Sequence, residues 1–257
     1  MPVPENTLKR RLASGEVLYG AWLGMADAYA AEMAATAGFD WLLIDGEHAP
    51  NDIRSLSEQL AAVLPSPSAA VVRPVHDDPA LIKQLLDIGA QSLLVPMVES
   101  ADQARAILRA TRYAPAGIRG VGASLARASR FGLVADYIAT ANDQICLILQ
   151  VESRAGMASL DEMLTIDGVD GVFIGPSDLA ADMGHPGNAG HPAVRDAVLG
   201  AISRIRAAGK TAGVLATDSA FIDDCLAAGA NFVGVGIDVL MYVGALRNLA
   251  AKYIPKD

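Results

Sequence analysis

One pattern recurs eight times along the chain: a short apolar run rich in β-branched residues, followed by a segment with helical character. Such runs are too short for helices and are typical of buried parallel strands. The expected strands are Val17–Trp22, Phe39–Asp45, Ala69–Arg73, Ser92–Val95, Ile145–Val151, Val169–Ile174, Thr211–Leu215 and Phe232–Val235. Eight alternating units favour a closed (β/α)8 barrel of the TIM type, with an open doubly wound sheet as the alternative.

No shift in composition and no long polar linker divides the chain, so residues 1–257 are expected to form one domain. A segment without this rhythm, Thr111–Leu133, precedes the fifth strand. The last helix is expected at about 239–252, with an apolar stripe that includes Leu240 and Leu246. This stripe either covers its own barrel or packs on a neighbouring subunit.

The composition excludes several classes of protein. The net charge of −9 argues against binding to nucleic acid or to an anionic membrane, because both require a basic surface. Cys146 and Cys225 lie in apolar segments without metal-binding spacing, so buried free thiols are expected. No signal peptide and no membrane-spanning run is evident. We therefore expect a cytoplasmic protein whose partners are small molecules or copies of itself.

Two acidic residues follow neighbouring strands in the predicted order. Glu152 stands just past the fifth strand, and Asp178 follows the Gly-Pro-Ser turn after the sixth. The carboxyl ends of parallel strands meet at one rim, where α/β proteins build their sites. Two facing carboxylates repel each other, and a hard cation such as Mg²⁺ or Mn²⁺ removes that conflict. The alternative is that each carboxylate only stabilises the first turn of a helix.

Other strand ends carry further candidates. The second strand ends in Asp45, Gly46, Glu47 and His48, so Asp45 is predicted to orient a proton-transferring His48. Arg73 ends the third strand and is placed to hold an oxyanion. The alternatives are that His48 is only a structural histidine and that Arg73 only forms a surface ion pair.

Arginines are concentrated in the irregular segment before the fifth strand. They are Arg112, Arg119, Arg127 and Arg130. We expect them near the mouth of the barrel, where they would suit substrates that bear carboxylates.

Two catalytic classes lack their required residues. A Schiff-base aldolase needs a lysine at the barrel mouth, and no lysine follows a predicted strand. A serine hydrolase of the α/β-hydrolase type needs a G-x-S-x-G turn, which is absent from the sequence. Carbonyl chemistry in this chain is therefore expected to use a metal ion.

Five segments in order resemble one known family, the HpcH/HpaI aldolases. They are FDWLLIDGEHAP, VVRPV, YAPAGIRGVGASLARASRFG, LILQVES and VFIGPSDLAADMG. These proteins are class II pyruvate aldolases of the phosphoenolpyruvate/pyruvate superfamily, and the likeness is greatest to those that cleave 4-hydroxy-2-oxoheptanedioate. Together the segments are specific, although each alone would not be. His76 is a departure, since relatives often carry Trp at that position.

The resemblance implies a role for each matching residue. Glu152 and Asp178 are then metal ligands, for Mg²⁺, Mn²⁺ or Co²⁺, and Arg73 holds the keto oxygen and enolate of pyruvate. His48 is the acid/base, with Asp45 behind it. The remaining residues implied in substrate binding are Trp22, Glu47, Gln150, Gly175, Pro176, Ser177 and Leu215. The resemblance also implies a homohexamer.

The expected reaction is the reversible cleavage of a 4-hydroxy-2-oxo acid to pyruvate and an aldehyde. A bound cation would stabilise the enolate of pyruvate, and His48 would move the proton of the C4 hydroxyl. The alternatives are an aldolase of 2-keto-3-deoxy sugar acids, a citryl- or malyl-CoA type lyase, and a non-catalytic binding barrel.

Overall fold

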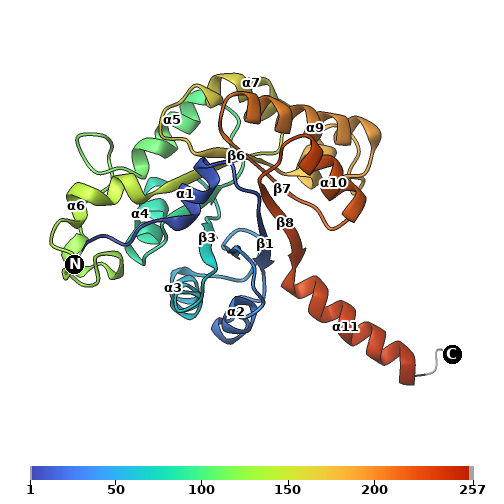
Figure 1. The fold of residues 1–257 in the computed structure, drawn as a ribbon, viewed down its shortest axis with the longest axis horizontal. Coiled ribbons are helices and arrows are strands. Elements are labelled where there is room, and N and C mark those ends of the chain that lie inside the picture. Colours follow the sequence, from blue (N-terminus) through green and yellow to red (C-terminus); the bar gives the residue numbers. More distant parts are fainter. Residues whose placement is uncertain (1, 255–257) are drawn as a thin grey trace.

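The computed structural model describes residues 2–254, and its eight strands close into one parallel barrel (Figure 1). The strands are β1 (Leu18–Leu23), β2 (Trp41–Asp45), β3 (Ala69–Arg73), β4 (Ser92–Val95), β5 (Cys146–Val151), β6 (Gly171–Ile174), β7 (Thr211–Leu215) and β8 (Phe232–Ile237). Each pairs in parallel with the next, and β8 pairs with β1. The predicted barrel is confirmed, and the open sheet is excluded.

Helices cover the outside of this barrel. They are α2 (Ala28–Ala35), α3 (Ile53–Val63), α4 (Pro79–Asp87), α5 (Ala101–Ala110), α7 (Arg154–Leu164), α8 (Pro176–Asp182), α9 (Pro192–Ala207) and α10 (Ser219–Ala227). Most begin at an Asp or Ser whose side chain accepts a hydrogen bond from a backbone N–H of the first turn; Asp78 and Asp218 are examples. These caps fix where the chain turns from rim to helix.

Aromatic rings fill the centre of the barrel. The Trp41 ring stacks on Phe232 with centroids 4.0 Å apart, and Trp22 lies 5.5 Å from Phe173. Gly20 makes this packing possible, because a Cβ at that position would overlap the Trp41 ring. The interior is therefore a packed core and not a channel.

A short helix that the sequence analysis did not anticipate closes the amino-terminal end of the barrel. This helix, α1 (Thr7–Ala13), begins at Asn6, whose side chain accepts a hydrogen bond from the Lys9 N–H. Leu8 and Leu12 are one helical turn apart and are buried in the same cluster as the barrel's aromatic rings. Because α1 closes this end, a site open to substrates must lie at the carboxyl ends of the strands.

The segment between α5 and β5 forms short turns, η1 (Ala123–Leu125), η2 (Arg127–Ser129), α6 (Tyr137–Thr140) and η3 (Ala141–Gln144). Arg119 is buried over the Tyr113 ring and pairs with Asp87 at 2.7 Å. Arg127 donates to the Ile88 carbonyl at the end of α4. Because α4 runs from the rim back to the amino end, these arginines lie opposite the mouth within one chain. The prediction that they lie near it is wrong.

The last helix, α11 (Asp238–Tyr253), projects away from the barrel (Figure 1). None of its residues is buried, and Leu240, Met241 and Tyr242 are all more than half exposed. Its stripe therefore does not cover its own barrel. Between residues 2 and 254, no helix combines the length and apolar character needed to cross a membrane.

Candidate active site

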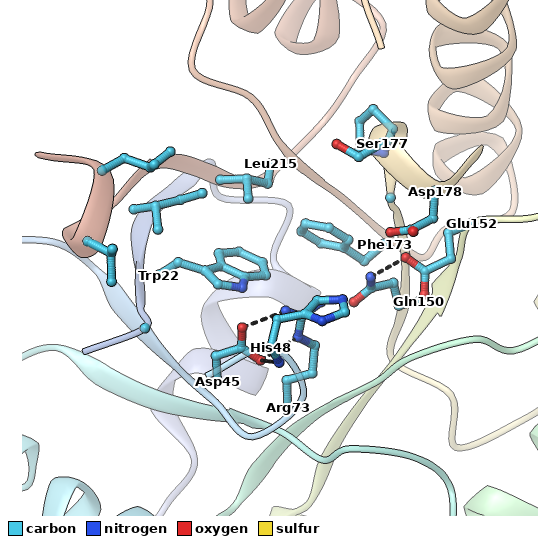
Figure 2. A pocket seen from close by; sticks show the side chains of 16 residues that line it. Trp22, Asp45, His48, Arg73, Gln150, Glu152, Phe173, Ser177, Asp178 and Leu215 are labelled. Atoms are coloured by element: carbon cyan, nitrogen blue, oxygen red, sulfur yellow. Dashed lines mark hydrogen bonds and ion pairs between the residues drawn. The ribbon is translucent and has the colours of Figure 1, made fainter. Parts of the chain in front are cut away.

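A cavity of about 380 Å³ opens at the carboxyl ends of the strands (Figure 2). It is lined by Trp22, Gly24, Asp45, His48, Arg73, Gln150, Glu152, Phe173, Gly175, Pro176, Ser177, Asp178, Leu215, Ile237, Val239 and Leu240. Every residue predicted for the site lines it except Glu47, which forms an ion pair with Arg73. Residues from seven strand ends thus converge as the parallel topology requires.

Glu152 and Asp178 lie on the same side of the cavity (Figure 2). They follow β5 and β6, which are paired through Val151 and Ile174. Glu152 is only 3% exposed. Burial, reinforced by the charges of Asp178 and Glu47, raises its pKa to about 7, although hydrogen bonds from Gln150 and Met97 oppose the shift. A neighbouring cation would stabilise the ionised form of this carboxylate, which burial disfavours.

Gln150 and Gly175 shape the surroundings of Glu152. The Gln150 amide donates to Glu152 Oε2 at 2.5 Å, and the Met97 N–H donates to Oε1 at 3.0 Å. The Gln150 Oε1 atom is buried without a hydrogen-bond partner. A Cβ at Gly175 would overlap Glu152 Oε2, so only glycine lets the carboxylate lie over this turn.

These residues fit a divalent cation. The two carboxylates are hard oxygen donors, which Mg²⁺ and Mn²⁺ prefer, and the unsatisfied amide oxygen of Gln150 lies in the same cavity wall. In residues 2–254, no cluster gathers three or more His, Cys, Asp or Glu ligands. The protein would therefore leave coordination positions open for waters and a substrate.

Arg73 is held by two carboxylates. Its Nε and Nη2 donate to the two oxygens of Asp45 at 2.8 and 2.6 Å, and its Nη1 lies 2.8 Å from Glu47 Oε2. Burial lowers the pKa of Arg73, but the Asp45 hydrogen bonds and the charges of Asp45, Glu47 and Glu152 leave it raised overall. The pKa of Glu47 is raised, chiefly by burial, although Arg73 and His48 oppose this. The guanidinium is thus fixed as a permanent cation.

His48 is placed differently from the prediction. Its side chain is 68% exposed, and its Nε2 lies 3.9 Å from Glu47 Oε2. The only hydrogen bond that His48 donates to Asp45 comes from its backbone N–H, at 3.4 Å, and the Asp45 carboxylate is occupied by the Arg73 guanidinium. The prediction that Asp45 orients the imidazole is therefore wrong. Asp45 orients Arg73 instead.

Two structural parts of the site were given no role from the sequence. Phe173 forms the wall beside Trp22, but it lies within an apolar strand that offers no signal of function. Asp238, at the start of α11, accepts from the Gly24 and Met25 N–H groups at 2.8 and 3.2 Å and so links the ends of β8 and β1. Its place after a strand was visible in the sequence, but its partners were not.

The fold and cavity define an α/β-barrel enzyme with a carboxylate pair at its mouth. The family model of the HpcH/HpaI aldolase/citrate lyase family matches residues 18–245. The chain belongs to that family, and it is an enzyme of the carbon–carbon lyase class.

Relatives at high identity bear two different names. A hydroxypyruvate/pyruvate aldolase from Roseovarius nubinhibens is 59% identical over the full length of both chains. A 2-keto-3-deoxy-L-rhamnonate aldolase from Klebsiella pneumoniae is 57% identical over 96% of this chain and 93% of its own. A crystal structure of an HpcH/HpaI aldolase/citrate lyase family protein from Burkholderia cenocepacia matches with a TM-score of 0.92 and 40% identity, covering 96% of this chain and 98% of that one. The aldolase class predicted from sequence is confirmed.

Proposed function

We propose that this chain is a divalent-metal-dependent class II aldolase that cleaves 4-hydroxy-2-oxo acids reversibly to pyruvate and an aldehyde. The observation that carries the proposal is the pair Glu152 and Asp178 in one cavity with Arg73. Burial raises the pKa of Glu152 to about 7, and a cation would favour the ionised carboxylate.

Glu152 and Asp178 would hold the cation, with Gln150 beside them. A bound Mg²⁺, Mn²⁺ or Co²⁺ supplies Lewis-acid stabilisation of negative charge on a carbonyl oxygen. The unpartnered Gln150 Oε1 and the turn Gly175–Pro176–Ser177 border the same space, so we assign them to the pyruvate end of the substrate.

Arg73 would stabilise the charge that develops on the keto oxygen when pyruvate loses a C3 proton. A donor fixed in place before the reaction needs no reorganisation during it. Asp45 and Glu47 hold three guanidinium nitrogens and so set the position of the group. We therefore assign them as positioning residues.

His48 would transfer the proton at the C4 oxygen of the hydroxy acid. It lines the cavity, and its exposed ring can exchange protons with solvent. In cleavage it would accept the C4 hydroxyl proton, and in condensation it would return a proton to the new alkoxide.

The disposition of lysines supports a metal route over an imine route. No lysine is among the residues that line the cavity, within the part of the chain that the structure covers. Lys210 donates to the carbonyls of Ile166 and Val169, on the approach to β6 at the opposite end of the barrel. An imine would need an amine within reach of the keto carbon.

Chelation tests the proposal. Enzyme treated with a chelator should lose pyruvate formation from a 4-hydroxy-2-oxo acid and regain it with Mg²⁺, Mn²⁺ or Co²⁺. A Glu152→Gln variant should not regain it, because the amide is a weaker metal ligand. Full activity after exhaustive chelation, or a pyruvate adduct trapped by borohydride, would contradict the metal route.

The sugar-acid aldolase is the second candidate. It differs in the aldehyde and not in the metal centre, and a relative at 57% identity bears such a name. Comparing cleavage of heptanedioate and 3-deoxy sugar-acid substrates separates the two.

We also propose a homohexamer in the cytoplasm, with α11 packed on a neighbouring subunit. The support is the exposed apolar surface of α11, which includes Leu246 and Leu249 and has no cover within one chain. Small molecules remain the only other expected partners, because the net charge of −9 disfavours nucleic acid.

A further inference from the structure

We infer that Gln103 is a positioning residue for the proposed metal site, and that it acts by holding the backbone turn that donates a hydrogen bond to Glu152. This inference rests on the proposed function and adds to it a residue outside the cavity. Gln103 is the third residue of α5 and does not line the cavity of the candidate active site. Any effect that it has on the chemistry must therefore pass through other groups.

The turn between β4 and α5, residues 96–99, is here called the Met97 turn. Its Met97 N–H donates to Glu152 Oε1 at 3.0 Å. The next N–H, that of Val98, donates to the Gln150 carbonyl at 3.0 Å. Because the Gln150 side chain donates to Glu152 Oε2, both oxygens of that carboxylate have a fixed partner. Partners of this kind orient a metal ligand, and their loss typically lowers metal affinity.

The backbone of this turn has an uncommon conformation at Met97. Its φ is +55°, in the left-handed region that residues with a side chain rarely adopt. A non-glycine residue stays there only when surrounding contacts hold it. The Met97 side chain is 50% exposed, so its own packing supplies little of that hold. The stabilising contacts must therefore be made to the backbone of the turn.

The Gln103 side chain supplies such contacts on both sides of the turn. Its Nε2 donates to the Met97 carbonyl at 3.1 Å, and its Oε1 accepts from the Glu99 N–H at 2.8 Å. The same Nε2 also donates to Asp77 Oδ2 at 3.0 Å. Only an amide can make this set of contacts, because it combines two donor hydrogens with an acceptor oxygen. Gln103 thus closes the turn across Val98.

Two neighbouring elements complete the arrangement. Asp77 lies in the loop that follows Arg73 at the end of β3, so Gln103 joins the loop of the oxyanion residue to the turn of the metal ligand. On the other side, a Cβ at Gly156 of α7 would overlap the Val98 carbonyl oxygen. Helix α7 therefore packs directly against the turn, which is held from α5 and α7 together.

A purely structural role for Gln103 makes a different prediction. Gln103 stands in the first turn of α5, where its backbone N–H donates to the Oγ of the capping Ser100 at 3.2 Å. If the side chain only stabilised this helix, its replacement would lower the free energy of unfolding and leave the metal affinity unchanged. If the side chain holds the Met97 turn, the metal affinity of the folded protein falls.

The metal affinity of Gln103→Met tests the inference. Methionine has a similar length and helix propensity but lacks the amide. Calorimetric titration with Mn²⁺ should give a Kd about tenfold or more above that of the wild type. Gln91→Met is the matched control, because the Gln91 amide also donates to a backbone carbonyl, that of Pro4 at 2.8 Å, but at the amino-terminal end of the barrel. Its Kd should equal that of the wild type. An unchanged Kd in Gln103→Met, or an equal rise in both variants, would overturn the inference.

Two further variants separate holding the turn from supporting the helix. Gln103→Glu keeps the length and an acceptor oxygen but cannot donate to the Met97 carbonyl, so it should also weaken Mn²⁺ binding. Glycine adopts positive φ readily, so Met97→Gly in the Gln103→Met background should recover part of the affinity. A weakened helix would not be repaired by that glycine. Wild-type affinity in Gln103→Glu, or no recovery with Met97→Gly, would contradict the inference.

A readout that needs no aldehyde separates this inference from the proposed function. Exchange of the pyruvate C3 protons with D₂O, followed by NMR, reports enolate formation alone. In Gln103→Met, the Mn²⁺ concentration that gives half-maximal exchange should rise with the Kd, while the rate at saturating Mn²⁺ should change far less. Wild-type values for both in Gln103→Met overturn only this inference. Absence of Mn²⁺ binding and of metal-dependent exchange in the wild type overturns the proposed function and this inference with it.

Discussion

Replacing Arg73 with lysine tests the geometry of the oxyanion site. Arg73 places three nitrogens within 2.8 Å of carboxylate oxygens of Asp45 and Glu47. Lysine keeps the charge but has one nitrogen, so two of the three contacts are lost. Charge-assisted hydrogen bonds contribute about 1.5–3 kcal/mol each. The retained charge offsets part of that loss, so we expect the free energy of unfolding to fall by about 3 kcal/mol, which is the lower end of the range for two such contacts.

The loss of turnover in Arg73→Lys should exceed what its loss of folding stability alone would cause. Losing one fixed donor at an oxyanion costs about 10²–10³-fold in kcat. Pyruvate C3 exchange measures this step, urea unfolding measures stability, and a metal titration checks that Glu152 and Asp178 still bind. Arg105→Lys is the control, since Arg105 also contacts two carboxylates at 2.8 Å but on the surface, and it should change little. Exchange within about threefold of wild type in Arg73→Lys would refute the assigned role.

Three further predictions concern the metal and the assembly. Burial is the main cause that raises the pKa of Glu152 to about 7, so protons compete with the metal ion for this carboxylate below that pH. The apparent Kd for the metal should therefore rise about tenfold for each pH unit that the pH falls. Calorimetry from pH 5 to 8 measures this Kd, and a Kd that does not change with pH would contradict the prediction. Gly175→Ala should abolish metal binding while circular dichroism stays native, because the added Cβ would overlap Glu152 Oε2; unchanged binding would show that the turn can yield. Light scattering should give the mass of a hexamer, and Leu246→Asp on α11 should reduce it; a monomeric wild type would remove the assembly proposal.

Strand positions were predictable because each strand is a short apolar run between segments with helical or turn character. The ends at Asp45, Arg73 and Leu215 match the structure, while β8 continues past Val235 to Ile237. Helix α1 was not predicted, because its two leucines stand among basic residues in the sequence. Their burial becomes evident only when the helix is placed against the amino-terminal end of the barrel.

The composition of the site could be predicted, but not its pairing. Sequence analysis placed Asp45, His48 and Arg73 at the rim, and neighbours in sequence suggested that Asp45 serves His48. The parallel register aligns Asp45 with Arg73 instead, and a bidentate guanidinium outcompetes a distant imidazole. The arginine-rich segment was misplaced for a similar reason, since its end of the barrel depends on which helix it follows.

The residue allowed at position 20 depends on the size of the residue at position 41, because the Trp41 ring fills the space where a side chain at Gly20 would lie. Because an added methyl would overlap the indole, Gly20→Ala alone should be damaging, and the damage should shrink when Trp41 is replaced by a smaller residue. The two positions therefore form a compensating pair across β1 and β2, in which a side chain at position 20 requires a smaller residue at position 41.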